Sequence, residues 1–230
     1  MARAVMHTAD IAAAHAQLEK SGVKFLSPPA TRSDGNRFAV FTDPDGTFYE
    51  LIELEGADGK SSDKPVIGLG RVNVNVSDFE RSEAWYRMFG YVPIRMLPPT
   101  DSAEVAAAMG LDSPYRINGA VLSHEVDGSE IELVQWLSPF DPEPAYPPPV
   151  SHLGIHRMAL LTSDIEADVA ALEAQGVAFI SEITPCCSGP DSAGRIVLFY
   201  DPDGTVVELV EQPFMGTVAR AMIWLRRLFE

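Results

Sequence analysis

The same pattern of hydrophobic and polar positions, with a predicted strand followed by an amphipathic helix, occurs more than once along the chain. Residues 4–8 and 157–162 are predicted strands, and each is followed by an aspartate and then by apolar residues at helical spacing. This spacing predicts amphipathic helices that begin after Asp10 and Asp164, whose side chains can accept a hydrogen bond from an otherwise unpaired backbone N–H. A glycine ends each helical pattern, and a short β-rich segment and a hairpin come next. The predicted order of elements is therefore βαβββ.

The hairpin shows that the chain contains an internal repeat. Residues 41–53 and 199–211 are identical at nine of thirteen positions, and both contain the turn sequence Asp-Pro-Asp-Gly. In such a turn, proline presets one backbone dihedral and glycine permits a positive one. The two copies are modules of about 55 residues, a length at which a unit is only marginally stable alone.

A third, diverged copy lies in the middle of the chain. Residues 71–78 alternate as a half-buried strand does, and residues 79–89 carry apolar side chains at helical spacing. An insertion over residues 97–114 contains a short helical segment. Two further strands are predicted over residues 117–125 and 130–136.

We therefore divide the chain into three modules, two linkers and a terminal helix. The predicted boundaries are residues 1–57 for module 1, 58–68 for a linker, 69–138 for module 2, 139–152 for a proline-rich linker, 153–213 for module 3 and 214–230 for an amphipathic C-terminal helix. Modules 2 and 3 are expected to pair with each other. Module 1 is then unpaired in the chain. Either a preceding module has been lost, or module 1 pairs with its twin from another chain, and we expect the second, a homodimer.

Composition and charge exclude several classes of protein. The chain is 46% hydrophobic and 22% charged, which is ordinary for a globular protein. Its formal net charge of −16 disfavours nucleic acid as a partner. No apolar run reaches the roughly 20 residues of a membrane-spanning helix, and the N-terminus lacks the apolar core of a signal peptide. We expect a cytoplasmic protein in which the adjacent Cys186 and Cys187 are ordinary loop thiols.

The βαβββ order, with Asp-Pro-Asp-Gly followed by Glu-Leu on the last strand, resembles the vicinal oxygen chelate superfamily. This superfamily includes glyoxalase I, bleomycin resistance proteins and extradiol dioxygenases, and the resemblance extends to about residue 212. It implies an α+β fold in which tandem βαβββ modules form cupped mixed sheets around a cavity. It also implies four inward-facing metal-ligand positions, because each module of a pair supplies one from its first strand and one from its last strand.

These positions are arginines on the first strands and glutamates on the last strands. The resemblance assigns them to Arg71, Glu132, Arg157 and Glu208, with Arg3 and Glu50 at the matching places in module 1. A guanidinium group stays protonated and has no lone pair for a metal, so we expect a degenerate metal site. The arginines and glutamates would either form structural ion pairs across the cavity or bind an anionic substrate such as a carboxylate or phosphate.

Three further residues are candidates for the same site. A one-residue bulge would turn His156 inward and give, with Glu132 and Glu208, a three-ligand site for a divalent ion such as Fe, Mn, Ni or Zn. The ordinary pleat would instead point His156 to the opposite face of its strand. His124 and Trp136 lie on or beside predicted strands of module 2 and are candidates for substrate contact. A hydrogen-bonded structural role is the alternative for His124.

Two functions are compatible with this site. The first is an enzyme of lyase, isomerase or dioxygenase type that acts on a small oxygenated, anionic molecule. Glu132 or Glu208 would then carry a proton, and Arg71 and Arg157 would stabilise developing negative charge. The second is a non-catalytic binding protein of the bleomycin-resistance type that sequesters a small molecule without metal. Loss of the histidines favours binding, whereas retention of the glutamates favours chemistry, and the fold does not decide between them.

Overall fold

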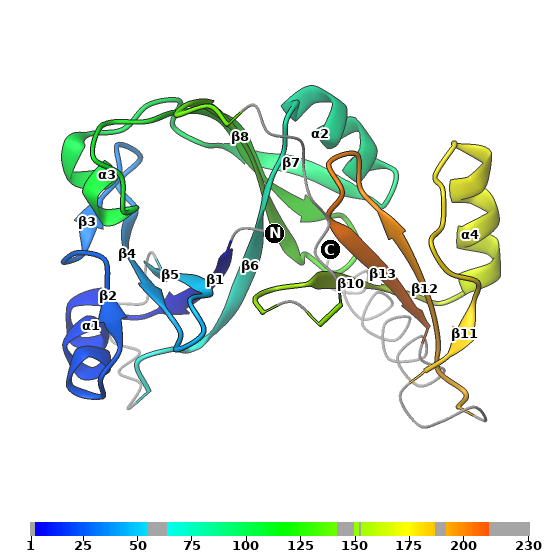
Figure 1. Ribbon diagram of the computed structural model, residues 1–230, viewed down its shortest axis with the longest axis horizontal. Helices are drawn as coiled ribbons and strands as arrows, with labels where there is room; N and C mark the ends of the chain where they lie inside the picture. Colours follow the sequence, from blue (N-terminus) through cyan, green and yellow to red (C-terminus); the bar gives the residue numbers. More distant parts are fainter. Residues whose placement is uncertain (1–2, 55–63, 142–149, 152, 187–191, 212–230) are drawn as a thin grey trace, which may run out of the picture.

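The computed structural model describes residues 3–54, 64–141, 150–151, 153–186 and 192–211 (Figure 1). The strands of this part of the chain form two mixed sheets, one of nine strands and one of four, which we call the large sheet and the small sheet. Helices lie against these sheets, so the α+β class is confirmed. The amphipathic helix predicted over residues 214–230 lies outside the described residues.

Module 1 folds in the predicted order, with a short additional strand. Its elements are β1 (Arg3–Thr8), α1 (Ile11–Lys20), β2 (Lys24–Phe25), β3 (Ala30–Thr31), β4 (Arg37–Thr42) and β5 (Phe48–Glu53). The Asp10 side chain accepts a hydrogen bond from the backbone N–H of Ala13 and so fixes the start of α1. The strand expected after the helix is reduced to two residues, and β3 follows it as a second short pairing with β4.

Module 2 contains the longest strands. Its elements are β6 (Gly68–Asn75), α2 (Phe79–Arg87), β7 (Tyr91–Met96), α3 (Ala103–Ala108), β8 (Arg116–His124) and β9 (Glu130–Ser138). The Asp78 side chain caps α2 by accepting from the backbone N–H of Arg81. The short helix predicted within the insertion is α3, and Ser102 caps it.

Module 3 forms the small sheet. Its elements are β10 (Arg157–Thr162), α4 (Ile165–Ala174), β11 (Thr184–Pro185), β12 (Arg195–Tyr200) and β13 (Val206–Glu211). The Asp164 side chain caps α4 through the backbone N–H of Ala167. The strand predicted directly after this helix is present only as an isolated bridge between Phe179 and Phe199.

The large sheet joins modules 1 and 2 through their first strands. Its order is β2-β4-β5-β1-β6-β9-β8-β7, with β3 beside β4. At the centre, β1 and β6 run antiparallel, and Ala4 lies opposite Val72. The expectation that module 1 is unpaired in the chain is therefore wrong. The homodimer no longer follows from an unpaired module 1, and it stays a prediction. The repeat could not decide the pairing, because every first strand leaves one edge open and any two of the three could meet.

The small sheet has the order β10-β13-β12-β11, so β10 is an edge strand among the described residues. Modules 2 and 3, which we expected to share a sheet, instead meet through α2. The Tyr86 hydroxyl on this helix donates to Asp201 Oδ2 at 2.9 Å, and Phe89 stacks on Phe199 with 5.6 Å between ring centroids. Buried residues of both modules form one hydrophobic cluster around this contact. The module boundaries predicted above stay predictions.

Two other expectations concern single features of the chain. Cys186 is disulfide-bonded, which corrects the expectation of an ordinary thiol, and Cys187 lies outside the described residues. Among the described residues, no helix is long and apolar enough to cross a membrane. The cytoplasmic location stays a prediction.

Candidate functional site in the cup of modules 1 and 2

One ion pair recurs in all three modules. In each, the arginine on the first strand donates from Nε to Oε2 of the glutamate on the last strand. The pairs are Arg3–Glu50 (2.6 Å), Arg71–Glu132 (2.9 Å) and Arg157–Glu208. The cause is the common register of the parallel strand pairs, which places the residue two positions after the arginine opposite the glutamate in every module.

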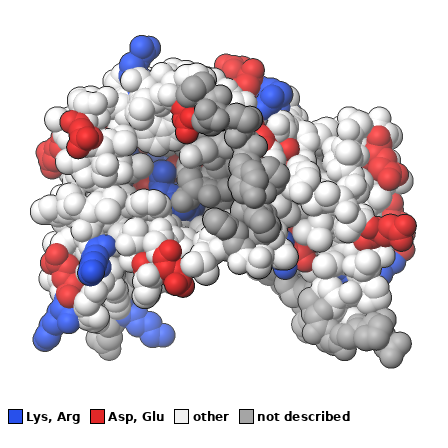
Figure 2. Space-filling model, viewed as in Figure 1, with Lys and Arg blue, Asp and Glu red and all other residues white. Residues whose placement is uncertain are grey.

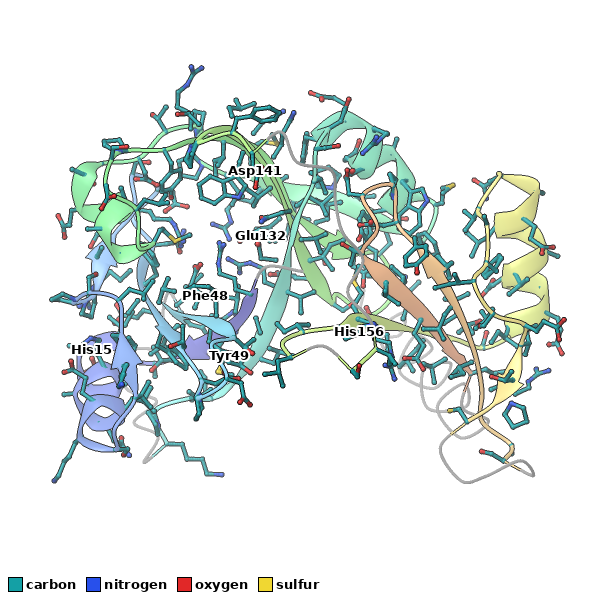
Figure 3. The ribbon with its side chains drawn as sticks, in the orientation of Figure 1. His15, Phe48, Tyr49, Glu132, Asp141 and His156 are labelled. Atoms are coloured by element: carbon teal, nitrogen blue, oxygen red, sulfur yellow. The ribbon has the colours of Figure 1, made fainter. Side chains whose placement is uncertain are left out.

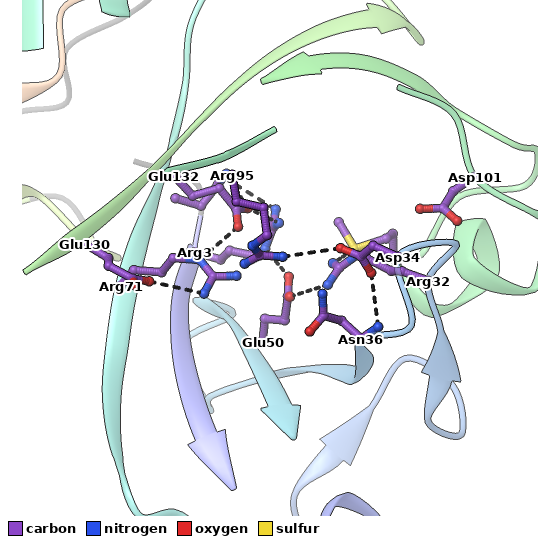
Figure 4. A network of polar contacts seen from close by, with 12 residues as sticks. Arg3, Arg32, Asp34, Asn36, Glu50, Arg71, Arg95, Asp101, Glu130 and Glu132 are labelled. Carbon is purple, nitrogen blue, oxygen red and sulfur yellow. Dashed lines mark hydrogen bonds and ion pairs between the residues drawn. The ribbon is translucent and has the colours of Figure 1, made fainter. Parts of the chain in front are cut away.

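The pairs of modules 1 and 2 merge into a single network at the β1–β6 seam (Figure 4). Arg3 Nη2 donates across the seam to Glu132 Oε1 at 2.9 Å. The same oxygen accepts from Asn73 Nδ2 at 3.2 Å, and Asn73 is completely buried. The structure therefore brings Arg71 and Glu132 together as expected. The residue from another module that joins them is Arg3 of module 1, and not a residue of module 3.

Arg32 is a third arginine of this network, and the sequence analysis missed it. It follows the short strand β3 and donates from Nη1 to Glu50 Oε1 at 2.8 Å. Its guanidinium carbon lies 3.7 Å from the centroid of the Phe38 ring, an arrangement typical of a cation–π contact. The residue stands in a loop whose sequence does not recur in module 3, so the repeat gave no signal for it.

The network contains more positive than negative charge. The buried groups of the network are three arginines, Arg3, Arg32 and Arg71, and two glutamates, Glu50 and Glu132, and none of these five side chains is more than 11% exposed. Burial alone would raise the pKa of Glu50, but Arg32 and Arg3 hold it well below its usual range. A third carboxylate, that of Glu130, lies 3.7 Å from Arg71 at the edge of the network. Its side chain is 31% exposed, so it offsets the positive charge of Arg71 less than a buried partner would.

The network lies at the bottom of a pocket that we call the cup. Tyr115 and Trp136 line it together with the arginines, and Arg95 pairs with Asp34 at 3.2 Å beside it. The Trp136 indole donates to Asn75 Oδ1, and Trp136 lines the cup; its contact with a substrate stays a prediction. Basic and acidic atoms are visible within a recess over this part of the molecule (Figure 2). The free volume is about 20 Å³, which is room for about one water molecule.

The donor set of the cup does not fit a divalent metal. Two of the four implied ligand positions are Arg3 and Arg71, which cannot coordinate a cation. Both oxygens of Glu50 accept hydrogen bonds from arginines, and both oxygens of Glu132 accept them from arginines or Asn73. Among the described residues, no three His, Cys, Asp or Glu side chains are grouped so that they could hold a metal ion.

The three-ligand site predicted around His156 is not formed. Glu132 lies in the large sheet and Glu208 in the small sheet, and each accepts from its own arginine. His156 lies just before β10, away from the cup (Figure 3). Its expected role required these residues of modules 2 and 3 to face one cavity, and the groove that the two modules line contains none of His156, Glu132 and Glu208.

The remaining candidates lie outside the cup. His124 ends β8, where its Nδ1 is 3.1 Å from Asp127 Oδ1 and its ring packs on Tyr91. This arrangement is that of a hydrogen-bonded structural histidine, although the ring also lines a groove between modules 2 and 3. Arg157 and Glu208 form their pair in module 3, where the Arg157 side chain is 40% exposed.

The family model of the Glyoxalase/Bleomycin resistance protein/Dioxygenase superfamily matches residues 2–51 and 68–209. The chain belongs to this superfamily. The match spans all three modules, and the superfamily membership expected from the repeat is therefore confirmed. No curated protein matches the chain.

Solved structures of this superfamily share the fold. Glyoxalase I from Zea mays is 19% identical with a TM-score of 0.63, and the alignment covers 97% of this chain and 70% of that one. A putative dioxygenase from Bacillus subtilis is 15% identical with a TM-score of 0.56, covering 93% and 62%. A glyoxalase family protein from Bacillus cereus is 18% identical with a TM-score of 0.54, covering 66% and 97%. At these identities the likeness shows the fold alone.

Proposed function

We propose that this superfamily member binds a small oxygenated molecule with a carboxylate or phosphate group, through the arginines of the cup and without a metal. The observation that carries the proposal is the excess of three buried arginines over two buried glutamates. A buried charge is costly unless it is paired, so an anionic group that entered the cup would be favoured there. Arginine is well suited to this role because its planar fork binds carboxylate or phosphate in bidentate fashion.

Entry of such a ligand requires a rearrangement of the pocket. The free volume of about 20 Å³ is far smaller than a ligand of several atoms needs. The Arg95–Asp34 pair joins β7 of module 2 to the segment before β4 of module 1, and its side chains are 39% and 24% exposed. Exposed ion pairs contribute little free energy, so opening this pair costs on the order of 1 kcal/mol or less. We infer that the ligand enters where Arg95 and Asp34 separate.

The same contacts favour binding over catalysis as the function. A glutamate that carries a proton must be able to exchange it with the substrate. Both carboxylate oxygens of Glu132 instead accept hydrogen bonds, from Arg3 and Asn73 on one oxygen and from Arg71 on the other, so a substrate would have to displace one of these donors. The enzymatic alternative, of lyase, isomerase or dioxygenase type, would need Glu132 to leave these partners during turnover.

Titration calorimetry with inorganic phosphate and a panel of small mono- and dicarboxylates tests this proposal. We expect Arg32→Gln to weaken binding of any ligand found by at least about 10-fold, because a charged hydrogen bond is worth about 1.5 to 3 kcal/mol. Arg37→Gln is the matched control, since Arg37 pairs with Glu53 outside the cup and is 43% exposed. Equal loss of affinity in both variants would contradict a ligand site at Arg32.

Elemental analysis of protein purified without chelator separates this proposal from the metalloenzyme alternative. We expect no stoichiometric metal, because the arginines occupy the implied ligand positions. A stoichiometric divalent metal that the Glu132→Gln variant loses would overturn the proposal.

A further inference from the structure

Among the ion pairs of the described residues, Arg32 uses only one of its two terminal nitrogens. Its Nη1 donates to Glu50 (Figure 4), whereas its Nη2 lies 3.8 Å from the thioether sulfur of Met109. A thioether is an uncharged and weak acceptor, so it satisfies a buried guanidinium group less well than a carboxylate would. Met109 therefore occupies the place where an anionic group would bind Arg32 best.

Met109 belongs to the insertion of module 2 and can move without the helix that carries it. It directly follows α3, whose buried side chains pack in one hydrophobic cluster with Ala30 of β3 (Figure 1). The Met109 side chain itself is half-buried and lines the cup. Methionine is unbranched and flexible, so this side chain can turn away from Arg32 while α3 stays packed. Such a movement adds free volume directly beside the guanidinium group.

The charge of the buried network matches a ligand with a single negative charge. Its three arginines and two glutamates leave an excess of one positive charge. One carboxylate would neutralise this excess. A phosphate dianion or a dicarboxylate would instead leave a second negative charge buried without a partner, which is costly. The network therefore favours a monoanion.

The walls of the cup favour an apolar body for this ligand. Tyr115, Ile117 and Val134 are buried residues that line the cup, and Leu97 and Trp136 line it beside them. The ring centroids of Tyr115 and Trp136 are 5.3 Å apart, and the rings are tilted by 59°. An aromatic or branched alkyl group packs favourably against such side chains, whereas a second charged group would lose its hydration there.

We propose that the ligand of the cup is a monocarboxylate with an apolar body, and that its carboxylate displaces the Met109 thioether from Arg32. The proposal rests on the binding function proposed above and narrows its ligand class. In the free protein, Met109 fills the anion position. On binding, the Met109 side chain turns away, the carboxylate accepts from Arg32 Nη2, and the apolar body packs against Tyr115 and Trp136. Met109 is thus a specificity-determining residue of the cup.

Titration calorimetry with benzoate, inorganic phosphate and succinate tests the ligand class. We expect benzoate to bind at least about 10-fold more tightly than phosphate or succinate, because it buries only one charge. Met109→Ala should strengthen benzoate binding by about 10-fold, since the side chain that competes for Arg32 is removed. Met96→Ala is the matched control and should leave the affinity unchanged, because Met96 is 59% exposed and is not among the residues that line the cup.

Nuclear magnetic resonance of isotope-labelled methionine methyl groups identifies the side chain that moves. The Met109→Leu variant assigns the Met109 methyl signal with little change in side-chain volume. We expect saturating benzoate to shift this signal and to leave that of Met158, which is buried in module 3, unchanged.

The possible outcomes separate the ligand class from the binding function on which it rests. Phosphate or succinate binding as tight as that of benzoate would overturn the proposal and leave anion binding by the cup intact. The same holds if benzoate binds but Met109→Ala does not strengthen binding, or if the Met109 methyl signal does not shift. If none of the three anions binds to the unaltered chain or to Met109→Ala, the binding function itself is wrong, and the proposal fails with it.

Discussion

The same arginine–glutamate pair has two different surroundings in this protein. In the cup, Arg3–Glu50 and Arg71–Glu132 lie at the seam of two modules, where arginines and Asn73 satisfy both carboxylates. In module 3, Arg157 lies on the edge strand β10 and is 40% exposed, and its partner Glu208 on the neighbouring strand is buried. The backbone register is identical, so the difference arises from what faces each pair. Repeated residues thus need not have repeated energetic roles, because burial sets the cost of leaving a charge without its partner.

Glu50→Gln should reduce stability more than the other substitutions considered, and it tests most directly the difference between the two surroundings. The substitution removes the buried carboxylate charge that Arg3 and Arg32 share, and Arg3 keeps its contact with Glu132. We expect a loss of about 3 to 5 kcal/mol in the free energy of unfolding, measured by urea denaturation. Glu208→Gln, in the half-open pair, should cost clearly less, and equal losses would contradict the distinction between the two surroundings.

The dependence of stability on pH should follow from the same glutamate. The pKa of Glu50 is lower in the folded chain than its ordinary value, so the unfolded chain takes up the proton first as the pH falls. The stabilisation is complete above the unfolded pKa of about 4.3 and is lost below it, toward the lower folded value, by up to about 1.4 kcal/mol per pH unit. Glu50→Gln should flatten this acid limb of the stability curve. An acid limb unchanged by the substitution would place the responsible carboxylates elsewhere.

Gly70→Ala tests the seam that only modules 1 and 2 possess. An added Cβ at this position would lie 2.3 Å from Nε2 of His7 on the facing strand, so the imidazole or the backbone would have to shift. We expect a loss of about 1 to 3 kcal/mol in unfolding experiments. Gly68→Ala is a closely matched control, because a Cβ there meets nothing within 4 Å. Similar stability of the two variants would show that the seam tolerates repacking.

Arg157→Met should have the smallest effect on the stability of a single chain. The Arg157 side chain is 40% exposed and that of Glu208 is 10% exposed, so solvent reaches this pair more than it reaches the pairs of the cup, and exposed ion pairs typically contribute about 1 kcal/mol or less. Arg71→Met should cost several times more, because it leaves the buried Glu132 with fewer donors. Thermal unfolding at high dilution compares the two without a contribution from association. A larger loss of stability for Arg157→Met than for Arg71→Met would contradict the prediction that the pair in the cup contributes more.

The local architecture was predictable from the sequence because its signals are short-range. Asp10, Asp78 and Asp164 cap helices where the pattern of polar and apolar residues places them. The arginine and glutamate of each module also pair within that module, since the repeat fixes their positions on neighbouring strands. These features depend on residues that one module carries by itself.

The arrangement of the modules was not predictable, because it depends on contacts between equivalent edges. All three first strands carry the same arginine and a similar pattern of side chains. The residues that decide the site were therefore misassigned: Arg3 and Glu50 complete the cup, whereas Arg157 and Glu208 do not. Arg32 enters from a loop with no counterpart in the repeat, and only the folded chain brings it to Glu50.

The position of helix α2 between the two sheets affects how the chain unfolds. Its residues pack in the same hydrophobic cluster as residues of module 3, and Tyr86 and Arg81 bind Asp201 and Asp203 of the last hairpin. Unfolding of module 3 would expose one side of this helix and so weaken the packing of the helix against the large sheet. The two sheets are therefore expected to unfold in one cooperative transition, although they share no strand. A scanning calorimeter should record a single heat-absorption peak instead of two.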